Sequence, residues 1–473
     1  MDSQGSSTLI ISYQSKDIEL SSLETRRHQL ERPPSHGDTS LFANPEPSSS
    51  SANVQVLPPV DEGWQAWMFC FAALVLEFSV WGFTFSYGIF QEYYTSHPPF
   101  NQASRVSVAA VGPTAIAVQY IEGLLLSFFY GRYPDMVKKS MWFGLALCVL
   151  SLTLCSFVNQ VWLLILLQGV GLGIAGGLLY WPIISFVSEW FVQRRGLAGG
   201  IIYAGSGIGG FVFPFLVNAL LVRFGHRWTL RIIALLQCIL GGVALLGVRP
   251  RISPTKYQRG QRRPQLIPPR IQFLKRKVFW ANSATNFLQA MSYFPVSLYI
   301  AVFTASISSP LSATIVLSLF NSAGVIGQII IGYLSDRFPY PWIMFTISMG
   351  SAIAAFLLWG FADTLARVFA FAIIFGSLSG GFPSVAFAAA TDSATPNTEQ
   401  APMALSAFSC VKGVAAIIGP IISGILLEAG KTITHGPYGK FGFGPVEIFV
   451  GSCSLACSLS SLAVAATRPQ VSR

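Results

Sequence analysis

Long apolar stretches recur along most of the chain and alternate with short polar segments. A helix needs about 20 predominantly apolar residues to cross about 30 Å of hydrocarbon at 1.5 Å per residue. Twelve stretches meet this requirement, and each predicts a membrane-spanning helix. They lie near residues 65–90, 106–129, 141–158, 161–188, 197–222, 229–248, 278–304, 311–334, 341–361, 366–390, 402–427 and 443–466.

The longest polar interruption in this series separates the sixth stretch from the seventh. Residues 249–277 hold ten Lys or Arg residues and no acidic residue. They divide the spans into six plus six, the arrangement expected when two similar bundles rock about a site near the middle of the membrane. We therefore expect an all-α membrane protein with twelve transmembrane helices in two six-helix bundles.

The expected domain boundaries follow from this division. Residues 1–62 are rich in Ser, Pro and charged residues and lack an apolar signal-peptide core, so we expect a disordered cytoplasmic tail. The remaining segments are an N-terminal bundle, a basic cytoplasmic loop, a C-terminal bundle and a short cytoplasmic tail, at residues 63–248, 249–277, 278–467 and 468–473.

The composition agrees with a membrane protein. Of the 473 residues, 52% are hydrophobic and 11% are charged, whereas about a quarter of the residues in a soluble protein are charged. Lys and Arg concentrate in the tails and the even-numbered loops, which places both termini in the cytoplasm. The plasma membrane is the default location, because no retention signal is present. We expect a monomer in a lipid bilayer, without nucleic acid as a partner.

One basic cluster departs from this distribution. Arg223, Arg227 and Arg231 follow the fifth span, on the outer side. They either support packing or attract an anionic solute, and the packing interpretation is favoured because charges at the membrane rim usually extend to the interface.

Two matches to GxGxxG begin at Gly171 and Gly205, which in a soluble α/β protein would indicate a dinucleotide site. Both lie inside long apolar stretches and neither follows a strand, so close helix packing explains them better. The chain has no HExxH, P-loop or CxxC motif. We therefore expect no cofactor, no metal site and no enzymatic activity.

The segment GYLSDRF, residues 332–338, ends the eighth span on the cytoplasmic side. It resembles the loop signature of the major facilitator superfamily, which implies a transporter fold in which Asp336 and Arg337 gate the bundles. Asp336 and Arg337 at a helix end can exchange helix-dipole and ion-pair contacts as the bundles move. GRYPDMVKKS, after the second span, repeats the signature in degenerate form and retains Asp135, which supports internal duplication.

Two further segments resemble signatures of the monocarboxylate transporter-like branch in its fungal version. They are DEGWQAW at residues 61–67 and WFVQRRGLAGGIIYAGSGIGG at residues 190–210. The resemblance implies transport of a small organic acid or fungal metabolite, with the paired Arg194 and Arg195 at a cytoplasmic entrance. A positive-inside distribution also explains this pair.

The chain departs from the animal lactate carriers of that branch. Those carriers are similar in having a Lys in the first span and an Asp and an Arg in the eighth. Here Phe85 lies near the expected Lys, and the eighth span offers Asn321 and Gln328. Proton-coupled lactate transport is therefore not implied, and a larger or less charged substrate is favoured.

Three ionisable residues fall well inside predicted spans. They are Glu77, Glu122 and Lys412, and each costs about 2.5–3.5 kcal/mol on insertion scales, so each indicates function. Glu77 is a candidate proton-coupling group. Glu122 and Lys412 are expected at similar depths on the second and eleventh spans, and they either contact each other or share a substrate carboxylate. A static ion pair is the alternative.

Polar side chains form one stripe on the seventh span. Asn282, Asn286, Gln289 and Tyr293 are spaced i, i+4, i+7 and i+11, so they share a helix face that should point to a cavity or a neighbouring helix. Tyr87 and Tyr180 of the N-terminal half are further candidates for the same site.

The sequence thus predicts a secondary transporter that moves a small organic solute, with or without protons, by alternating access, in either direction. The alternative is a nutrient sensor that keeps the transporter fold. The short tail and central loop favour the carrier, because neither is long enough for a typical signalling domain.

Overall fold

The computed structural model describes residues 58–254, 257, 261, 263–267, 271–396, 398–431 and 437–468. Helices make up most of this part of the chain, and none of its residues lies in a strand. Helices dominate because backbone polar groups within hydrocarbon must be paired inside their own segment. Most of the predicted tails, 1–62 and 468–473, and part of the loop 249–277 lie outside the described residues.

The helices fall into an N-terminal and a C-terminal half. The N-terminal half contains α2 Trp64–Phe85, α3 Tyr87–Ser96, α4 Arg105–Ala109, α5 Val111–Arg132, η1 Pro134–Met136, α6 Val137–Cys155, α7 Val161–Leu164, η2 Ile165–Gly171, α8 Leu172–Trp190 and α9 Arg195–Gly247. The C-terminal half contains η3 Gln272–Lys275, α10 Lys277–Ile307, α11 Pro310–Arg337, α12 Tyr340–Ile353, η4 Ala354–Trp359, α13 Leu365–Gly380, η5 Phe382–Val385, α14 Ala386–Ala394, η6 Thr398–Gln400, α15 Ala401–Gly430, η7 Lys440–Gly442 and α16 Gly444–Thr467.

Eleven helical segments of the described chain are long and apolar enough to cross a membrane, and one of them contains two spans. Helix α9 has 53 residues, which at 1.5 Å per residue is about 80 Å, far more than one crossing. It bends at Gly225, where φ is 69° and ψ is 174°, a conformation that only glycine adopts readily. The predicted spans 197–222 and 229–248 are therefore joined by a bend without a loop, which gives twelve crossings.

The arginine cluster at this bend contacts the loop between α6 and α7. Arg227 donates to Asn159 Oδ1 at 2.9 Å, and Arg231 donates to Ser156 Oγ at 3.0 Å. The Arg231 guanidinium also lies over the Trp228 ring. These contacts support the packing interpretation of the cluster.

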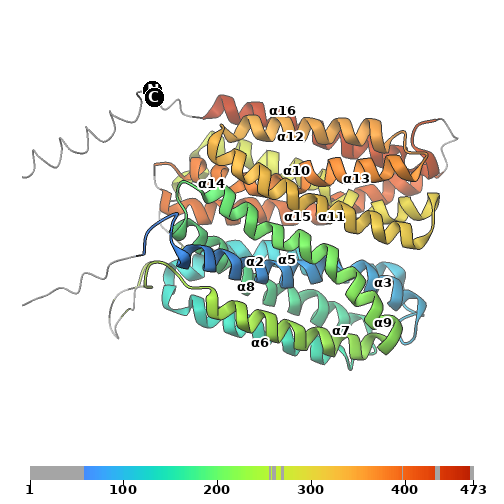
Figure 1. The fold of residues 1–473 in the computed structure, drawn as a ribbon, viewed down its shortest axis with the longest axis horizontal. Helices are drawn as coiled ribbons and strands as arrows, with labels where there is room; N and C mark the ends of the chain where they lie inside the picture. The colour runs from blue at the N-terminus through green and yellow to red at the C-terminus, as the bar shows by residue number, and fades with distance from the viewer. Residues whose placement is uncertain are drawn as a thin grey trace, which may run out of the picture. The chain divides into compact units, whose positions relative to one another are not determined.

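The two halves meet along two pairs of helices. Helix α9 packs against α11, so the fifth span contacts the eighth. Helix α5 packs against α15, so the second span contacts the eleventh. In Figure 1 the helices run side by side, with α2, α6 and α8 in the lower part and α12, α13 and α16 in the upper part. A site between the halves is therefore bordered by helices from both.

The buried apolar residues show where the halves close. We call the end of the bundle that carries residues 58 and 468 the tail end; it lies at the left of Figure 1. At the tail end one hydrophobic core contains residues of both halves, for example Tyr203 and Phe387. Toward the opposite end each half has a core of its own. The structure is therefore closed at the tail end.

Glycines allow the close helix contacts on which this packing depends. A Cβ on Gly205 would lie 2.3 Å from the carbonyl oxygen of Leu74 on α2, and one on Gly207 would lie 2.8 Å from that of Asn321 on α11. The second GxGxxG segment thus faces two partner helices. Its glycines serve packing, as expected from helix association in lipid.

Candidate functional site

A cavity lies between the two halves, bordered by residues about midway along their helices. Its atom-free space, with the open solvent at its mouth included, is about 750 Å³. The lining residues are Glu77, Trp81, Phe85, Tyr120, Tyr180, Tyr203, Ser206, Asn286, Gln289, Tyr293, Phe294, Gln328, Ser379, Gly380, Pro383, Ala386, Leu405, Phe408, Ser409 and Lys412. Seven of the predicted site residues are among them: Glu77, Lys412, Tyr180, Asn286, Gln289, Tyr293 and Gln328.

Helical spacing brings these side chains to the cavity. Glu77, Trp81 and Phe85 follow one another at intervals of four residues on α2, so they share a face. The predicted stripe on α10 reaches the cavity with Asn286, Gln289 and Tyr293. Trp81 and Phe85 were missed as site residues, although their spacing from Glu77 was a usable signal.

Two ionisable side chains lie in the cavity without pairing with each other. Glu77 is 2% exposed and its Oε1 has no hydrogen-bond partner. Lys412 is 9% exposed, and its Nζ lies 5.6 Å from the centre of the Tyr120 ring. No ion pair in the described part of the chain involves either residue. An unpaired charge at this depth is costly, so both groups are suited to act on a solute or proton.

Two glutamines that line the cavity carry buried acceptor oxygens without a partner in the described part of the chain. Gln289 Nε2 donates to the Ser379 carbonyl at 3.0 Å, and Gln328 Nε2 donates to the Gly380 carbonyl at 3.2 Å. A carbonyl can only accept, so each amide nitrogen is fixed and each Oε1 is left over. Both Oε1 atoms are buried and have no hydrogen-bond partner among the described residues, which leaves two unused acceptors on residues that line the cavity.

Aromatic rings form a continuous wall. The Trp81 ring lies 4.8 Å from that of Tyr120 and 5.5 Å from that of Tyr180, between centres. Tyr120 meets Phe294 of the other half at 6.3 Å, and Tyr180 donates to the Tyr203 hydroxyl at 3.3 Å. Offset and edge-to-face contacts at these distances are favourable. Tyr120 and Tyr203 are further lining residues that the sequence did not single out.

The predicted contact between Glu122 and Lys412 is absent. The helices that carry them do meet, since a Cβ on Gly413 would lie 2.8 Å from Tyr120 Cβ. Glu122 points instead toward α8, where a Cβ on Gly177 would lie 1.3 Å from its Oε1. Glu122 does not line the cavity, whereas Tyr120 does. The two residues are two positions apart on α5, which turns their side chains about 200° from each other.

Three other predicted site residues are engaged elsewhere. Tyr87 donates its hydroxyl to the Val108 carbonyl, and Asn321 Nδ2 donates to the Gly210 carbonyl at 3.2 Å in the contact between α11 and α9. Asn282 Nδ2 donates at 3.3 Å to both Tyr340 Oη and Ser393 Oγ. None of the three lines the cavity.

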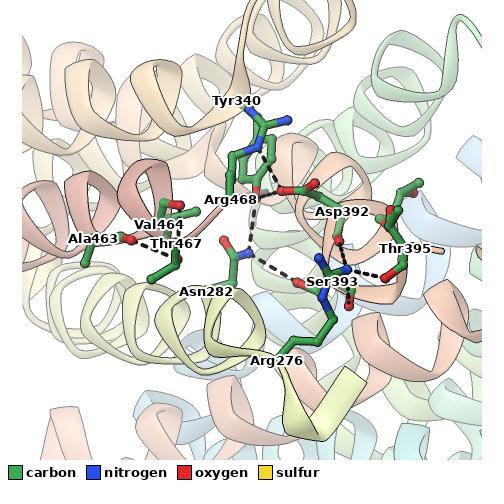
Figure 2. A network of polar contacts seen from close by, with 11 residues as sticks. Arg276, Asn282, Tyr340, Asp392, Ser393, Thr395, Ala463, Val464, Thr467 and Arg468 are labelled. Atoms are coloured by element: carbon green, nitrogen blue, oxygen red, sulfur yellow. Dashed lines mark hydrogen bonds and ion pairs between the residues drawn. The ribbon is translucent and has the colours of Figure 1, made fainter. Parts of the chain in front are cut away.

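Asn282 belongs to a polar network at the tail end of the C-terminal half, shown in Figure 2. Asp392 of α14 accepts from Tyr340 Oη at 2.7 Å and from Arg468 Nε at 2.9 Å. Arg276 donates to the carbonyls of Asp392, Ser393 and Thr395. The network ties together α10, α12, α14 and the segment after α16.

Two carboxylates hold the start of α9. Asp61 accepts from the backbone N–H groups of Val192, Gln193 and Arg194 at 2.9–3.0 Å. Asp336 accepts from those of Gly196 and Leu197 at 2.7 and 2.8 Å. Helix N-termini carry unpaired N–H groups and a positive dipole end, and carboxylates satisfy both.

The two carboxylates differ in which parts of the chain they join. Asp61 belongs to the N-terminal half, as α9 does, whereas Asp336 comes from α11 and joins the halves. The capping role of Asp61 was missed, because 131 residues separate it from its first partner.

The other predicted gating residues lie near this contact, except Asp135. Arg195 Nη1 donates to Thr391 Oγ1 of the C-terminal half at 2.7 Å. Arg194 precedes the first residue of α9, and the Arg337 guanidinium lies over the Tyr333 ring at 4.4 Å. Asp135 pairs with Arg263 of the central loop at 2.9 Å.

The sequence matches known transporters along most of its length. The family model described as Major Facilitator Superfamily matches residues 68–309 and 285–464. The chain is 30% identical to the fujikurins efflux protein of Gibberella fujikuroi, over 77% of this chain and 80% of that protein. It is 28% identical to the MFS transporter asaE of Aspergillus flavus, over 80% of this chain and 84% of that protein. It is 27% identical to the aspyridones efflux protein apdF of Emericella nidulans, over 83% of this chain and 76% of that protein.

A solved structure shows the same fold. The transporter FucP in its outward conformation matches with a TM-score of 0.60 and 13% identity, over 84% of this chain and 99% of that chain. Helix content, twelve crossings, the family match and this likeness agree with one another. The chain belongs to the Major Facilitator Superfamily.

Proposed function

We propose that this multi-pass membrane protein carries a small organic solute across the membrane by alternating access, with the cavity between the halves as its binding site. The observation that supports this most directly is the location of the cavity. It lies between two halves that share a core at the tail end and have separate cores toward the opposite end. Motion of the halves about such a site exposes it to each side in turn.

Lys412 and Glu77 are the proposed ionisable groups of the site, with Asn286, Gln289, Tyr293, Gln328 and Tyr180 as polar partners. Lys412 offers a positive charge to an acidic solute. Glu77, on the other half, is the proposed proton-coupling group. Both are buried in the cavity without an ion partner.

The contact of Asp336 with Gly196 and Leu197 is the proposed gate at the tail end. Its two charge-assisted hydrogen bonds must break before the halves can part there. Hydrogen bonds to a charged group contribute about 1.5–3 kcal/mol, an amount that a solute or a proton can supply. Arg195 reinforces the gate through Thr391.

The orientation that fits the distribution of basic residues places the tail end and both termini in the cytoplasm. The two bundles in this proposal are residues 63–248 and 278–467. The structure is then an outward-facing state. We place the chain as a monomer in the plasma membrane. The segments at residues 61–67 and 190–210 support the monocarboxylate transporter-like branch.

The direction we propose is efflux, and the cargo is an organic acid or secondary metabolite. Two relatives are named as efflux proteins, and Lys412 favours an acid.

Flux of labelled organic acids into proteoliposomes tests this function. We expect saturable flux that Lys412→Gln abolishes and Asp336→Asn changes. Asp363→Asn is the matched control, because this residue forms an exposed ion pair with Arg367. Absence of flux for every acid in a broad panel, with folded protein in the liposomes, would count against a carrier.

A further inference from the structure

The walls of the cavity differ between the two halves. Of its seven lining residues from the N-terminal half, five are aromatic. The C-terminal half contributes Lys412, three amides and two serines among its lining residues. A solute between the halves therefore meets mostly rings on the N-terminal side, and on the C-terminal side a cation and amides beside the rings of Tyr293, Phe294 and Phe408.

The aromatic side is suited to a flat apolar surface. Trp81 contacts Tyr120 and Tyr180, with ring centres 4.8 and 5.5 Å away, and Tyr203 extends this wall through its bond to Tyr180. Aromatic side chains lose little conformational entropy on binding and prefer ring partners in offset or edge-to-face contact. An unbranched aliphatic chain would use this wall less well.

The polar side presents one cation and two acceptors. Lys412 is nine-tenths buried and forms no ion pair with any residue that the structure describes. The Oε1 atoms of Gln289 and Gln328 are buried and unpartnered, while their Nε2 atoms are committed to backbone carbonyls. With Glu77 on the facing wall as the proposed proton carrier in its protonated form, the complement is a ligand with one negative charge and at least one hydrogen-bond donor at another position.

From these observations we propose that the cargo is a planar aromatic monoacid that also carries a hydroxyl or N–H donor. Its ring lies against the Trp81 wall, its acidic group pairs with Lys412, and its donor reaches Gln289 or Gln328. This rests on the proposed function in taking the cavity as the transport site. Because such a solute contacts both halves at once, its binding can couple their movement.

Equilibrium binding to the full chain in lipid nanodiscs tests the proposal by calorimetry. The probes are 6-hydroxy-2-naphthoate, its 6-methoxy analogue without the donor, 6-hydroxy-2-naphthamide without the charge, and decanoate without the ring. We expect the first to bind most tightly. Loss of the charge should weaken binding at least about 30-fold, and loss of the donor about three- to tenfold. Decanoate should bind more weakly than the hydroxynaphthoate.

Variants assign each preference to a residue. The Lys412→Gln variant should bind 6-hydroxy-2-naphthoate and 6-hydroxy-2-naphthamide with equal affinity. In the double variant Gln289→Met with Gln328→Met the hydroxy and methoxy acids should bind equally, while the preference for the acid remains. Lys139→Gln, at an exposed position, should behave like the wild type.

Three results would overturn the proposal: decanoate binding as tightly as the hydroxynaphthoate, no naphthoate binding to folded wild-type protein, or preferences that persist in the variants. Failure of the carrier function gives a different result. Naphthoate binding with these preferences but without flux would contradict the carrier function and leave the proposed ligand class standing. Flux of a non-aromatic acid without naphthoate binding would remove only the substrate class.

Discussion

Lys412 and Glu77 each carry an ionisable group into the middle of the protein, and neither forms an ion pair in the described part of the chain. A buried pair that served stability would be hydrogen bonded within itself, because breaking such a pair leaves a costly uncompensated charge. Neither residue has this arrangement: Lys412 Nζ lies 5.6 Å from the centre of the Tyr120 ring, and no ion pair among the described residues involves Lys412 or Glu77. Their placement lowers stability and favours a binding role.

This gives a prediction about stability at the residue scale. Lys412→Met should raise the thermal unfolding temperature of the purified protein, because an isolated cation at span depth costs about 2.5–3.5 kcal/mol on insertion scales. The same variant should lose solute flux. Lys139→Met, at an exposed position, should change neither quantity. A lower unfolding temperature for Lys412→Met would indicate that the lysine is a structural residue.

The fate of the predicted site residues shows what a sequence can reveal at this scale. Depth along a span follows from the distance to its ends, so Glu77 and Lys412 were expected deep inside their spans, and both line the cavity. The direction of a single side chain around the helix axis does not follow from that distance. Lys412 was therefore the wrong partner for Glu122, although α5 and α15 do pack together. Asn282 shares the face of Asn286 but lies one turn nearer the tail end, where Tyr340 and Ser393 bind it.

At the scale of elements, α9 joins several parts of the fold. Its glycines let α2 and α11 approach on two sides, its start is capped by Asp61 and Asp336, and its bend at Gly225 replaces a loop. Hydropathy located both of its spans, because apolar length alone defines a crossing. The joining of those spans could not be read, since the cause is the backbone conformation of one glycine.

Close backbone contact between α2 and α9 gives a second prediction. A Cβ on Gly82 would lie 2.4 Å from the Cα of Gly209, and two backbones cannot yield as a side chain can. Gly82→Ala should therefore destabilise the protein by about 1–3 kcal/mol, as expected for overpacking. Gly88→Ala has open space around its Cβ and should be neutral or slightly stabilising. Thermal unfolding of both variants checks this, and equal unfolding temperatures would contradict it.

The two caps of α9 give a third prediction. Asp61→Asn and Asp336→Asn each weaken charge-assisted bonds to the helix start, so each should lower stability by about 0.5–2 kcal/mol. Only Asp336 joins the halves. Alkylation of a cysteine at cavity position Ser409, with reagent applied from the tail side, should therefore rise in Asp336→Asn and stay at the control level in Asp61→Asn. Equal labelling in both variants would show that Asp336 is a cap without a gating role.

At the scale of the whole molecule, an even number of crossings, twelve, returns the chain to the side of the membrane on which it began. Residues 249–277 and both termini should lie on the same side of the membrane, which the distribution of Lys and Arg assigns to the cytoplasm. Protease protection of tags inserted after Ser253 and at each terminus checks this in sealed vesicles. Tags on opposite sides would show that α9 does not cross twice.

Alternating access requires that the two ends of the bundle move in opposite senses. Spin labels at exposed positions can report both ends in a cysteine-free background: Lys139 with Trp342 at the tail end, and Val222 with Leu311 at the other. Asp336→Asn weakens the contact that closes the tail end, so it should populate the alternate state.

The most direct test is double electron–electron resonance on these two label pairs, with and without Asp336→Asn. We expect the Lys139–Trp342 distance distribution to shift to longer values and the Val222–Leu311 distribution to shift to shorter values. Two distributions that stay unchanged, or that shift in the same direction, would contradict a carrier in which the halves rock about the central cavity.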